Sequence, residues 1–269
     1  SGGVDSMLLM HVLHQLAAKH RWRLVVAHFN HKLRGRASDA DQRLVQKSAK
    51  HLKLKISTAS WGSEPAAVKE YGLEMAARNA RLSFLDKAAR RHRCTYVATG
   101  HHRDDQVETF FWRLFRGAGG MGLSGMRQVD DFPLNFGLKI IRPLLMFGKD
   151  EIRKFANEEK LKFREDNSNQ DVAILRNRIR GKLLPYLRRN FHSGIEFPIN
   201  QSQELIGADA EFARDTAREW LDAKRKLPFD QLHLAVQRWV IWHQLIELNI
   251  DPQYHIIEDL RLSAEKFFS

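Results

Sequence analysis

The first six residues, Ser-Gly-Gly-Val-Asp-Ser, place small and polar residues directly before an apolar segment with helical spacing. Two glycines let the backbone turn tightly and approach a ligand without a Cβ in the way. Their N–H groups, the hydroxyls of Ser1 and Ser6 and the start of a helix form a cradle for an anion such as phosphate. Asp5 would repel phosphate by itself, so it fits this cradle if it holds a magnesium ion that bridges the phosphates. The alternative is a serine–glycine turn that only caps a helix.

A second group of residues carries paired acids. Asp105 and Glu108 are three residues apart, and Asp104 and Glu108 four apart, in a predicted helix over 104–115, so the acids share one face. The helix follows a predicted strand, and open α/β sheets bind ligands at the carboxyl ends of their strands. Such carboxylates can hold an ammonium group, help to position magnesium or remove the proton of an amine. The alternative is stabilisation of the helix dipole, worth only ~0.3–1 kcal/mol for each acid.

Basic residues occur in two settings. Arg78 and Arg81 are three apart in a predicted helix over 74–91, where they could stabilise charge on phosphate or simply face solvent. Residues 172–195 contain no acid but carry Arg176, Arg178, Arg180, Lys182, Arg188 and Arg189. A solvated helix face normally mixes both signs of charge. An acid-free basic stretch therefore favours binding to a polyanion such as nucleic acid.

The elements that must position these groups alternate between helix and strand over the first part of the chain. We expect helices directly after Asp5 and over 38–52, 74–91, 104–115 and 148–159, strands over 24–29, 55–59, 95–99 and 138–141, and a glycine-rich loop over 117–125. This alternation predicts a parallel sheet covered on both faces. From about residue 201 the pattern is helical only, with helices over 208–224, 231–248 and 254–262. We therefore expect a catalytic domain over 1–193, a linker over 194–200 and a helical domain over 201–269.

Composition restricts the class of protein. The chain has 269 residues, a formal net charge of +12 and one cysteine, Cys94. One cysteine excludes, within a single chain, a disulfide framework, a cysteine-based zinc site and an iron–sulfur cluster. The positive charge lies in residues 1–199, whereas residues 200–269 carry more acids than bases. No run approaches the ~18 apolar residues of a membrane span, and no leader marks secretion, so we expect a cytoplasmic protein without membrane contact.

The opening segment resembles the SGGxDS loop of the N-type ATP pyrophosphatases, in which the loop follows a strand. The sequence begins at Ser1, so we expect the first strand of the domain to lie outside it. The resemblance is narrowed by HFNHKLR at 28–34, EMAARNAR at 74–81, HHRDDQVET at 101–109, RGAGGMGL at 116–123, RPLL at 142–145, EDNSN at 165–169 and RNRIR at 176–180. In this order, from Ser1 to about Pro185, the segments resemble the tRNA(Ile)-lysidine synthetases.

The resemblance implies an α/β fold with a doubly wound parallel sheet of the adenine-nucleotide alpha-hydrolase type and a smaller all-helical domain. It implies a ligase of tRNA modification that uses ATP and Mg²⁺. Such an enzyme adenylates the wobble cytidine (position 34) of an isoleucine tRNA with a CAU anticodon. Free L-lysine then attacks C2, which gives lysidine and AMP after the earlier release of pyrophosphate.

The resemblance also implies roles for individual residues. The residues expected to bind ATP are Ser1, Gly2, Gly3, Val4, Asp5, Ser6, His28, His31 and His101, with Asp5 also on magnesium. The expected catalytic residues are Asp5, Arg78, Asp105 and Glu108, of which the last two also bind the substrate lysine. The expected tRNA contacts are Arg34, Arg81, Arg176, Arg178, Arg180 and Lys182. Asn177 and residues 165–169 are more suited to bracing the end of the domain.

Three other functions fit parts of the pattern. An RNA thiolase with the same loop usually needs a pair of cysteines, and this chain has one. A small-molecule synthetase of the NAD- or GMP-forming type would not need the acid-free basic stretch. An RNA-binding protein with a relic nucleotide loop would not need Asp5, Arg78, Asp105 and Glu108. The sequence leaves the oligomeric state open, a homodimer included.

Overall fold

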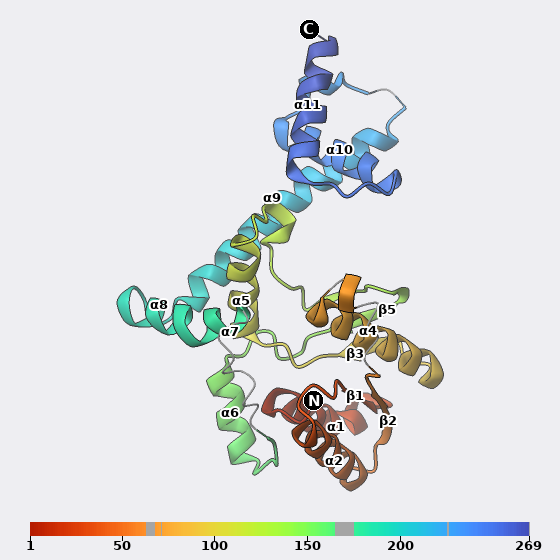
Figure 1. The fold of residues 1–269 in the computed structure, drawn as a ribbon, viewed down its shortest axis with the longest axis vertical. Helices are drawn as coiled ribbons and strands as arrows, with labels where there is room; N and C mark the ends of the chain where they lie inside the picture. Colours follow the sequence, from red (N-terminus) through yellow and green to blue (C-terminus); the bar gives the residue numbers. More distant parts are fainter. Residues whose placement is uncertain (63–67, 71, 165–174, 225, 269) are drawn as a thin grey trace. The chain divides into compact units, whose positions relative to one another are not determined.

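Two compact units make up the chain in the computed structural model. The structure describes residues 1–62, 68–70, 72–164, 175–224 and 226–268. One unit consists of Ser1–Thr109 and Met126–Glu196, and the other of Phe110–Gly125 and Phe197–Ser269. Figure 1 labels their helices and strands.

The strands of the first unit run mainly in parallel. They are β1 (Val25–Asn30), β2 (Lys55–Ser60), β3 (Tyr96–Ala98), β4 (Val129–Phe132) and β5 (Asn135–Ile141). β1 pairs with β2 from Val25↔Lys55 to Asn30↔Ser60, and β3 pairs with β5, both in parallel. These pairs confirm the predicted parallel arrangement. β4 was not predicted: it pairs antiparallel with β5, and its two central acids, Asp130 and Asp131, give it little apolar character.

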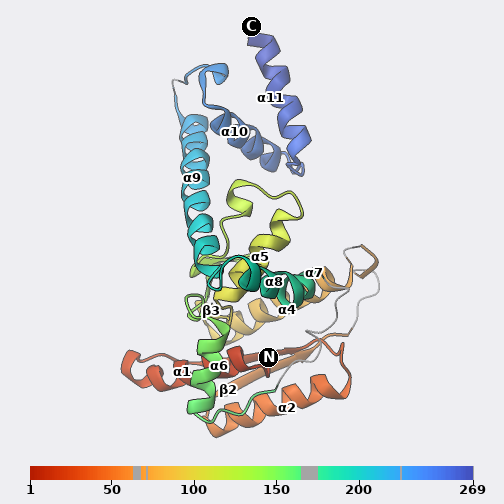
Figure 2. The ribbon, with the colours of Figure 1, turned by 90° about the vertical axis from the view of Figure 1, so that its left-hand side faces the viewer.

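Helices cover both faces of these strands. They are α1 (Val4–His20), α2 (Arg36–His51), α4 (Leu73–His92), α5 (Arg103–Leu114), α6 (Lys149–Glu158), α7 (Leu175–Arg178) and α8 (Leu184–Asn190), with a π-helical turn, η3 (Ile179–Leu183), between the last two. In β3, Val97 packs against a cluster that contains Leu82 of α4, whereas Ala98 packs against a cluster that contains Leu9 of α1. Adjacent strand residues point to opposite faces, so the doubly wound arrangement is confirmed. Figures 1 and 2 show α2 and α4 on opposite sides of β1 and β2.

Burial of apolar side chains fixes α1 over the strands. Val4, Leu8 and Leu9 are buried against Ile152 and Ala156 of α6. Burying each of the larger side chains stabilises the fold by about 1.5–3 kcal/mol. The start of α1 is thereby held at the carboxyl ends of the parallel strands, which we call the carboxyl edge.

The second unit is helical, as predicted for the residues from 201 onward, but it also includes Phe110–Gly125, which we expected in the first domain. It contains the end of α5, η1 (Gly120–Gly122), α9 (Glu196–Asp222), η4 (Phe229–Gln231), α10 (Leu234–Glu247) and α11 (Tyr254–Phe268). Its core joins Ala217 to Val236 and Val240, and Leu245 to Ile257. The predicted linker over 194–200 is wrong, because α9 begins at Glu196. Pro198 is tolerated there since the first turn of a helix has N–H groups without helical partners.

Candidate active site

The opening loop forms a compact turn at the start of α1. Gly3 is the N-cap of this helix, and the hydroxyls of Ser1 and Ser6 lie 2.8 Å apart. A Cβ on Gly100, just after β3, would lie 3.1 Å from the backbone carbonyl carbon of Asp5. A side chain at this position would require the loop backbone to give by a few tenths of an ångström, so glycine suits the close approach of this segment to the loop. The loop thus places free N–H groups of a helix start where the sheet ends, as a phosphate site requires.

The Asp5 carboxylate is paired with the ammonium group of Lys149. Lys149 Nζ donates to both carboxylate oxygens of Asp5, at 2.6 and 2.7 Å. Lys149 is the first residue of α6, where the helix dipole disfavours a positive charge. Its contact shows that the Asp5 carboxylate faces a position suited to a cation. This donor chemistry fits a magnesium ion shared with phosphates, although the described residues include no cluster of three acidic, histidine or cysteine ligands.

His102 links the loop to the acids of α5. Its buried ring places Nε2 3.9 Å from Asp5 Oδ1 and 3.5 Å from Asp105 Oδ2. Burial lowers the pKa of His102, but Asp104, Asp105 and Asp5 together outweigh it and raise the pKa above its ordinary value. The imidazole therefore lies between Asp5, which we predicted to hold magnesium, and Asp105, which we predicted to bind the substrate lysine.

Asp104 is held by several donors. The backbone N–H of Lys149 donates to its Oδ2 at 2.8 Å, and Arg188 donates to its Oδ1 at 2.9 Å. Burial opposes ionisation of this carboxyl, but His102 and the Lys149 N–H hold the pKa of Asp104 well below its usual range. Arg188 also contacts Glu196 at 2.6 Å, so it ties α5 to the first residue of α9. Asp104 acts as a structural junction rather than as an exposed acid.

Glu108 and Asp105 face two arginines. Glu108 is 1% exposed, and it accepts hydrogen bonds from Arg176 Nε at 3.0 Å and from Arg180 Nη2 at 2.8 Å. The same arginines lie farther from Asp105, at 3.5 and 3.6 Å. Asp105 also accepts the backbone N–H of His102 at 3.0 Å. The pair of acids was predicted; its pairing with arginines was not.

Helical spacing divides the basic segment into two faces. Arg176 and Arg180 are four residues apart and turn toward Glu108, whereas Arg178 and Lys182 are exposed. Neither Arg178 nor Lys182 forms an ion pair or hydrogen bond with any residue that the structure describes. Residues four apart share a helix face, so alternate basic residues point inward and outward. Arg176 and Arg180, which we predicted to contact tRNA, would have to leave Glu108 in order to bind a phosphate. Arg178 and Lys182 could bind phosphate without giving up an ion pair to a described residue.

The predicted arginines of α4 differ in exposure. Arg78 is exposed, whereas Arg81 is partly buried near Arg78 and Arg176. Burial, followed by these two charges, lowers the pKa of Arg81. Arg81 has no hydrogen-bond or ion-pair partner among the described residues. A partly buried guanidinium without a carboxylate is well suited to an anionic ligand.

The three predicted histidines lie close to this guanidinium or to the loop. Burial lowers the pKa of His28 and of His101 to about 4, and it also lowers the pKa of His31, as does Arg81. His101 Nδ1 lies 2.9 Å from Thr99 Oγ1. Both ring nitrogens of the buried His28 lack a partner within the described part of the chain. All three rings are therefore neutral near pH 7, which suits contact with a nucleotide better than contact with a metal-bound anion.

Arg34 is already paired in this structure. It donates to Asp41 Oδ2 at 2.7 Å, and Arg164 donates to the other oxygen at 2.7 Å. Asp41 in turn lies against Gly2, whose added Cβ would meet the Asp41 Cβ at 3.2 Å. Arg34 thus supports the loop through Asp41, a role that the sequence did not indicate.

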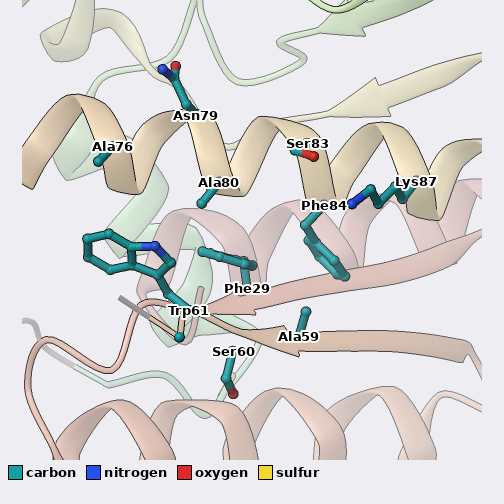
Figure 3. A pocket seen from close by; sticks show the side chains of 11 residues that line it. Phe29, Ala59, Ser60, Trp61, Ala76, Asn79, Ala80, Ser83, Phe84 and Lys87 are labelled. Carbon is teal, nitrogen blue, oxygen red and sulfur yellow. The ribbon is translucent and has the colours of Figure 1, made fainter. Parts of the chain in front are cut away.

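A cleft of about 480 Å³ lies between α4 and the ends of β1 and β2. Figure 3 shows Phe29, Trp61 and Phe84 turned toward one another below α4, with Asn79, Ser83 and Lys87 along the helix. None of the predicted site residues lines this cleft. The cleft is therefore separate from the charged groups described above.

Lys149 and His102 are the site residues that sequence reasoning missed. The signal for Lys149 was a lysine in the first turn of the predicted helix 148–159, where acids are preferred. The signal for His102 was its place between a strand end and three acids of one helix. Neither signal reveals the partner, because the contacts join segments far apart in the chain.

Comparison with known proteins assigns a family to this arrangement. Residues 1–187 match the PP-loop domain family. A tRNA(Ile)-lysidine synthase of Chlorobaculum tepidum is 37% identical over 88% of this chain and 71% of that protein. The chain belongs to the tRNA(Ile)-lysidine synthase family. The PP-loop match also confirms the predicted fold class and a family that uses ATP.

Other family members extend the comparison. The tRNA(Ile)-lysidine synthase of Geobacter sulfurreducens is 45% identical over 78% of this chain and 43% of its own length. That of Bacillus subtilis is 35% identical over 81% and 46%. The chain thus spans less than half the length of these two relatives.

A solved structure supports the fold. A U34-tRNA thiolase from Methanococcus maripaludis superposes with a TM-score of 0.60 at 19% identity, over 77% of this chain and 70% of that one. At this identity the likeness concerns the fold alone. Among the described residues, no helix is both long and apolar enough to span a membrane.

Proposed function

We propose that this protein joins the side-chain amine of free L-lysine to C2 of cytidine 34 in an isoleucine tRNA with a CAU anticodon. The product is lysidine, with AMP and pyrophosphate released. The observation that carries this proposal is the bridging position of His102. It brings the Asp5 carboxylate of the nucleotide loop and the Asp105 carboxylate of α5 within 3.9 and 3.5 Å of one imidazole ring.

The first step activates the base. O2 of the cytidine attacks the α-phosphorus of ATP, and pyrophosphate leaves. The N–H groups at the start of α1 would hold the phosphates, and Arg78 and Arg81 would balance the charge that grows on them. Magnesium, held by Asp5 when bound, would neutralise phosphate charge. Lys149, which now contacts Asp5 at 2.6 Å, would then release this carboxylate and could donate to the phosphates instead.

The second step forms the carbon–nitrogen bond. The amine attacks C2, the bond between C2 and the bridging oxygen breaks, and AMP leaves. A lysine amine has a reference pKa near ~10.4, so it must lose a proton before it attacks. Asp105 is the better placed acid for the ammonium group, because its arginine contacts are long. Glu108 would hold Arg176 and Arg180 beside the substrate and shape the pocket.

Contacts with tRNA would come from the outward face of the basic segment. Arg178 and Lys182 are exposed and unmatched by acids of the described chain. Arg34, Arg176 and Arg180 could join them only by exchanging their carboxylate partners for phosphates. The helices from residue 201 onward would add recognition of the rest of the tRNA.

Pyrophosphate release tests the proposal. With purified protein, ATP should be consumed only when the tRNA is present, and turnover should be complete only when lysine is added. Mass spectrometry of nucleosides from the product tRNA should detect lysidine. Sulfur incorporation would instead show a thiolase, and ATP use without tRNA a small-molecule synthetase. An RNA-binding protein whose nucleotide loop is inactive would release no pyrophosphate under any condition.

A further inference from the structure

The opposite edge of the same strands is strongly basic. We call it the amino edge: the ends of α1, α2 and α4 together with the residues that lead into β1, β2 and β3. Residues 15–25, 46–56 and 87–96 contain no acid. Their lysines and arginines are Lys19, Arg21, Arg23, Lys47, Lys50, Lys53, Lys55, Lys87, Arg90, Arg91 and Arg93, and all of them are exposed.

Three separate contacts bring these segments together. Val25 of β1 pairs with Lys55 of β2. Arg23 Nη2 donates to the carbonyl of His92 at 2.6 Å and to that of Arg93 at 3.2 Å. His92 Nε2 lies 2.8 Å from Ser57 Oγ. The basic side chains thus share one surface and are not spread around the unit, as the neighbouring ends of α1, α2 and α4 in Figure 2 also indicate.

Part of this charge has a structural explanation. Lysine, arginine or histidine occupies the last turn of α1, α2 and α4, where a cation stabilises the helix dipole. Arg90 is also paired with Asp86. That explanation also reaches Arg21 and Arg93, which are the C-cap residues of α1 and α4. It does not cover Lys53 and Lys55, which lie beyond the C-cap of α2.

The backbone at three of these positions would favour another residue. Arg21, Lys53 and Arg93 each follow one of the three helices with a positive φ, of 55°, 54° and 52°. Glycine is the usual residue in this conformation, because a Cβ is unfavourable there. All three positions carry an exposed cation instead. At these three positions glycine would therefore remove a cation without straining the backbone.

An exposed aromatic ring lies among these cations. Trp22 is 45% exposed, and its ring stacks on His20 with a centroid distance of 4.7 Å and an interplanar angle of 19°. The neighbouring residues in the chain are Arg21 and Arg23. Exposed aromatic rings beside basic side chains are how proteins bind single-stranded nucleic acid, by base stacking and phosphate contact.

We infer that the amino edge is a second RNA-binding surface, remote from the loop of residues 1–6. Arg21, Lys53 and Arg93 bind phosphates, and Trp22 stacks on an unpaired base. A strand of six residues at about 3.3 Å for each residue separates this surface from the carboxyl edge by roughly 20 Å. RNA bound here therefore does not occupy the candidate active site, and binding does not depend on lysidine formation.

A triple variant tests the phosphate contacts. Arg21→Gly, Lys53→Gly and Arg93→Gly remove charge at positions whose backbone suits glycine, so the thermal midpoint should not fall. The probe is a labelled uridine oligomer of about 12 nucleotides, which offers no cytidine to the active site. Binding should weaken roughly a hundredfold near 0.1 M salt, and the log–log salt slope should flatten by about 2, since each of the three single-strand contacts contributes about 0.7.

Matched variants locate the effect. Lys160→Gly removes a cation of the same positive φ at the end of α6, outside the acid-free segments, and should leave the slope unchanged. Trp22→Ala should weaken binding roughly fivefold or more without changing the slope, because stacking is not ionic. An unchanged slope in the triple variant overturns the inference. Binding to phosphatidylserine vesicles but not to RNA, or loss only with Arg178→Ala, overturns it as well.

Discussion

The two edges of the parallel strands use positive charge in opposite ways. At the carboxyl edge most cations are matched: Lys149 by Asp5, Arg176 and Arg180 by Glu108, and Arg188 by Asp104. At the amino edge most cations point into solvent without a carboxylate among the described residues. The net charge calculated from the sequence counts paired and unpaired cations alike, although the two kinds contribute differently to stability and binding.

The difference shows what net charge does in this protein. Matched charges in a partly buried site are held in fixed positions, and removing one partner leaves an unbalanced charge. Unmatched surface charges cost little stability and act through the field and counterions. We therefore expect substitutions at the carboxyl edge to change catalysis and stability, and substitutions on exposed cations to change only binding.

The largest effect should follow Asp5→Ala. This change removes the carboxylate that Lys149 contacts and that would hold magnesium. Pyrophosphate release should fall by about 100-fold to 1,000-fold, comparable with loss of a key charge-stabilising group, while tRNA binding stays nearly intact. Asp150→Ala, on the exposed side of α6, is the control. Turnover at the wild-type rate would remove Asp5 from the site.

Glu108→Gln should destabilise the fold and impair the lysine step. The buried carboxylate balances two arginines, and breaking a buried pair costs about 3–5 kcal/mol. Urea unfolding should show this loss, with no comparable loss for the exposed Glu158→Gln. The lysine dependence of turnover should change more than adenylation. An unaltered lysine dependence would place Glu108 outside the pocket.

Acid should destabilise the protein through His28. Burial lowers its pKa from 6.5 to about 4, so the unfolded chain binds more protons between these values. Stability should therefore fall as the pH drops from about 6.5 to about 4, by no more than about 3 kcal/mol for this group. In the His28→Leu variant, the free energy of unfolding measured with urea should depend less on pH between about 4 and 6.5. The same slope in both proteins would contradict the assignment.

The smallest effect should follow Arg178→Ala. Arg178 is exposed and unmatched, so stability should change by less than about 0.5 kcal/mol. Binding of tRNA should weaken, and its log–log salt slope should flatten by about 0.7–0.9. Arg180→Ala, two residues away, should instead lower stability, because it leaves Glu108 with one arginine. Equal stability losses in the two variants would mean that the segment does not have two faces.

The sequence predicted the elements better than the contacts. Strand 24–29 was recognisable as a short apolar run with β-branched residues at its centre, and helix 74–91 by its high content of Ala, Leu and Arg. β4 was not, since Asp130 and Asp131 suppress its strand pattern, and 194–200 was mistaken for a linker because Pro198 is rare within helices but tolerated in a first turn.

The candidate site was predictable only in part. Asp5, Asp105 and Glu108 stand in recognisable motifs, so their residue types indicated the chemistry. The pairing of Lys149 with Asp5 joins residues 144 apart, and that of Arg180 with Glu108 joins residues 72 apart. No local pattern contains such contacts, because tertiary packing decides them. The same holds for the division of residues 176–182 into inward and outward cations.

The π-helical turn Ile179–Leu183 holds one more residue in its turn than an α-helix would. Deleting Gly181 would restore regular α-helical winding and leave the side chains on either side of the turn facing as before. Arg188 would then keep its contacts with Asp104 and Glu196. Deleting Tyr186 from the regular helix α8 would instead rotate Arg188 by about 100° and turn it away from both acids. The segment can therefore lose a residue at the π turn, but not in the helix that follows it, without losing its connection to Asp104 and Glu196.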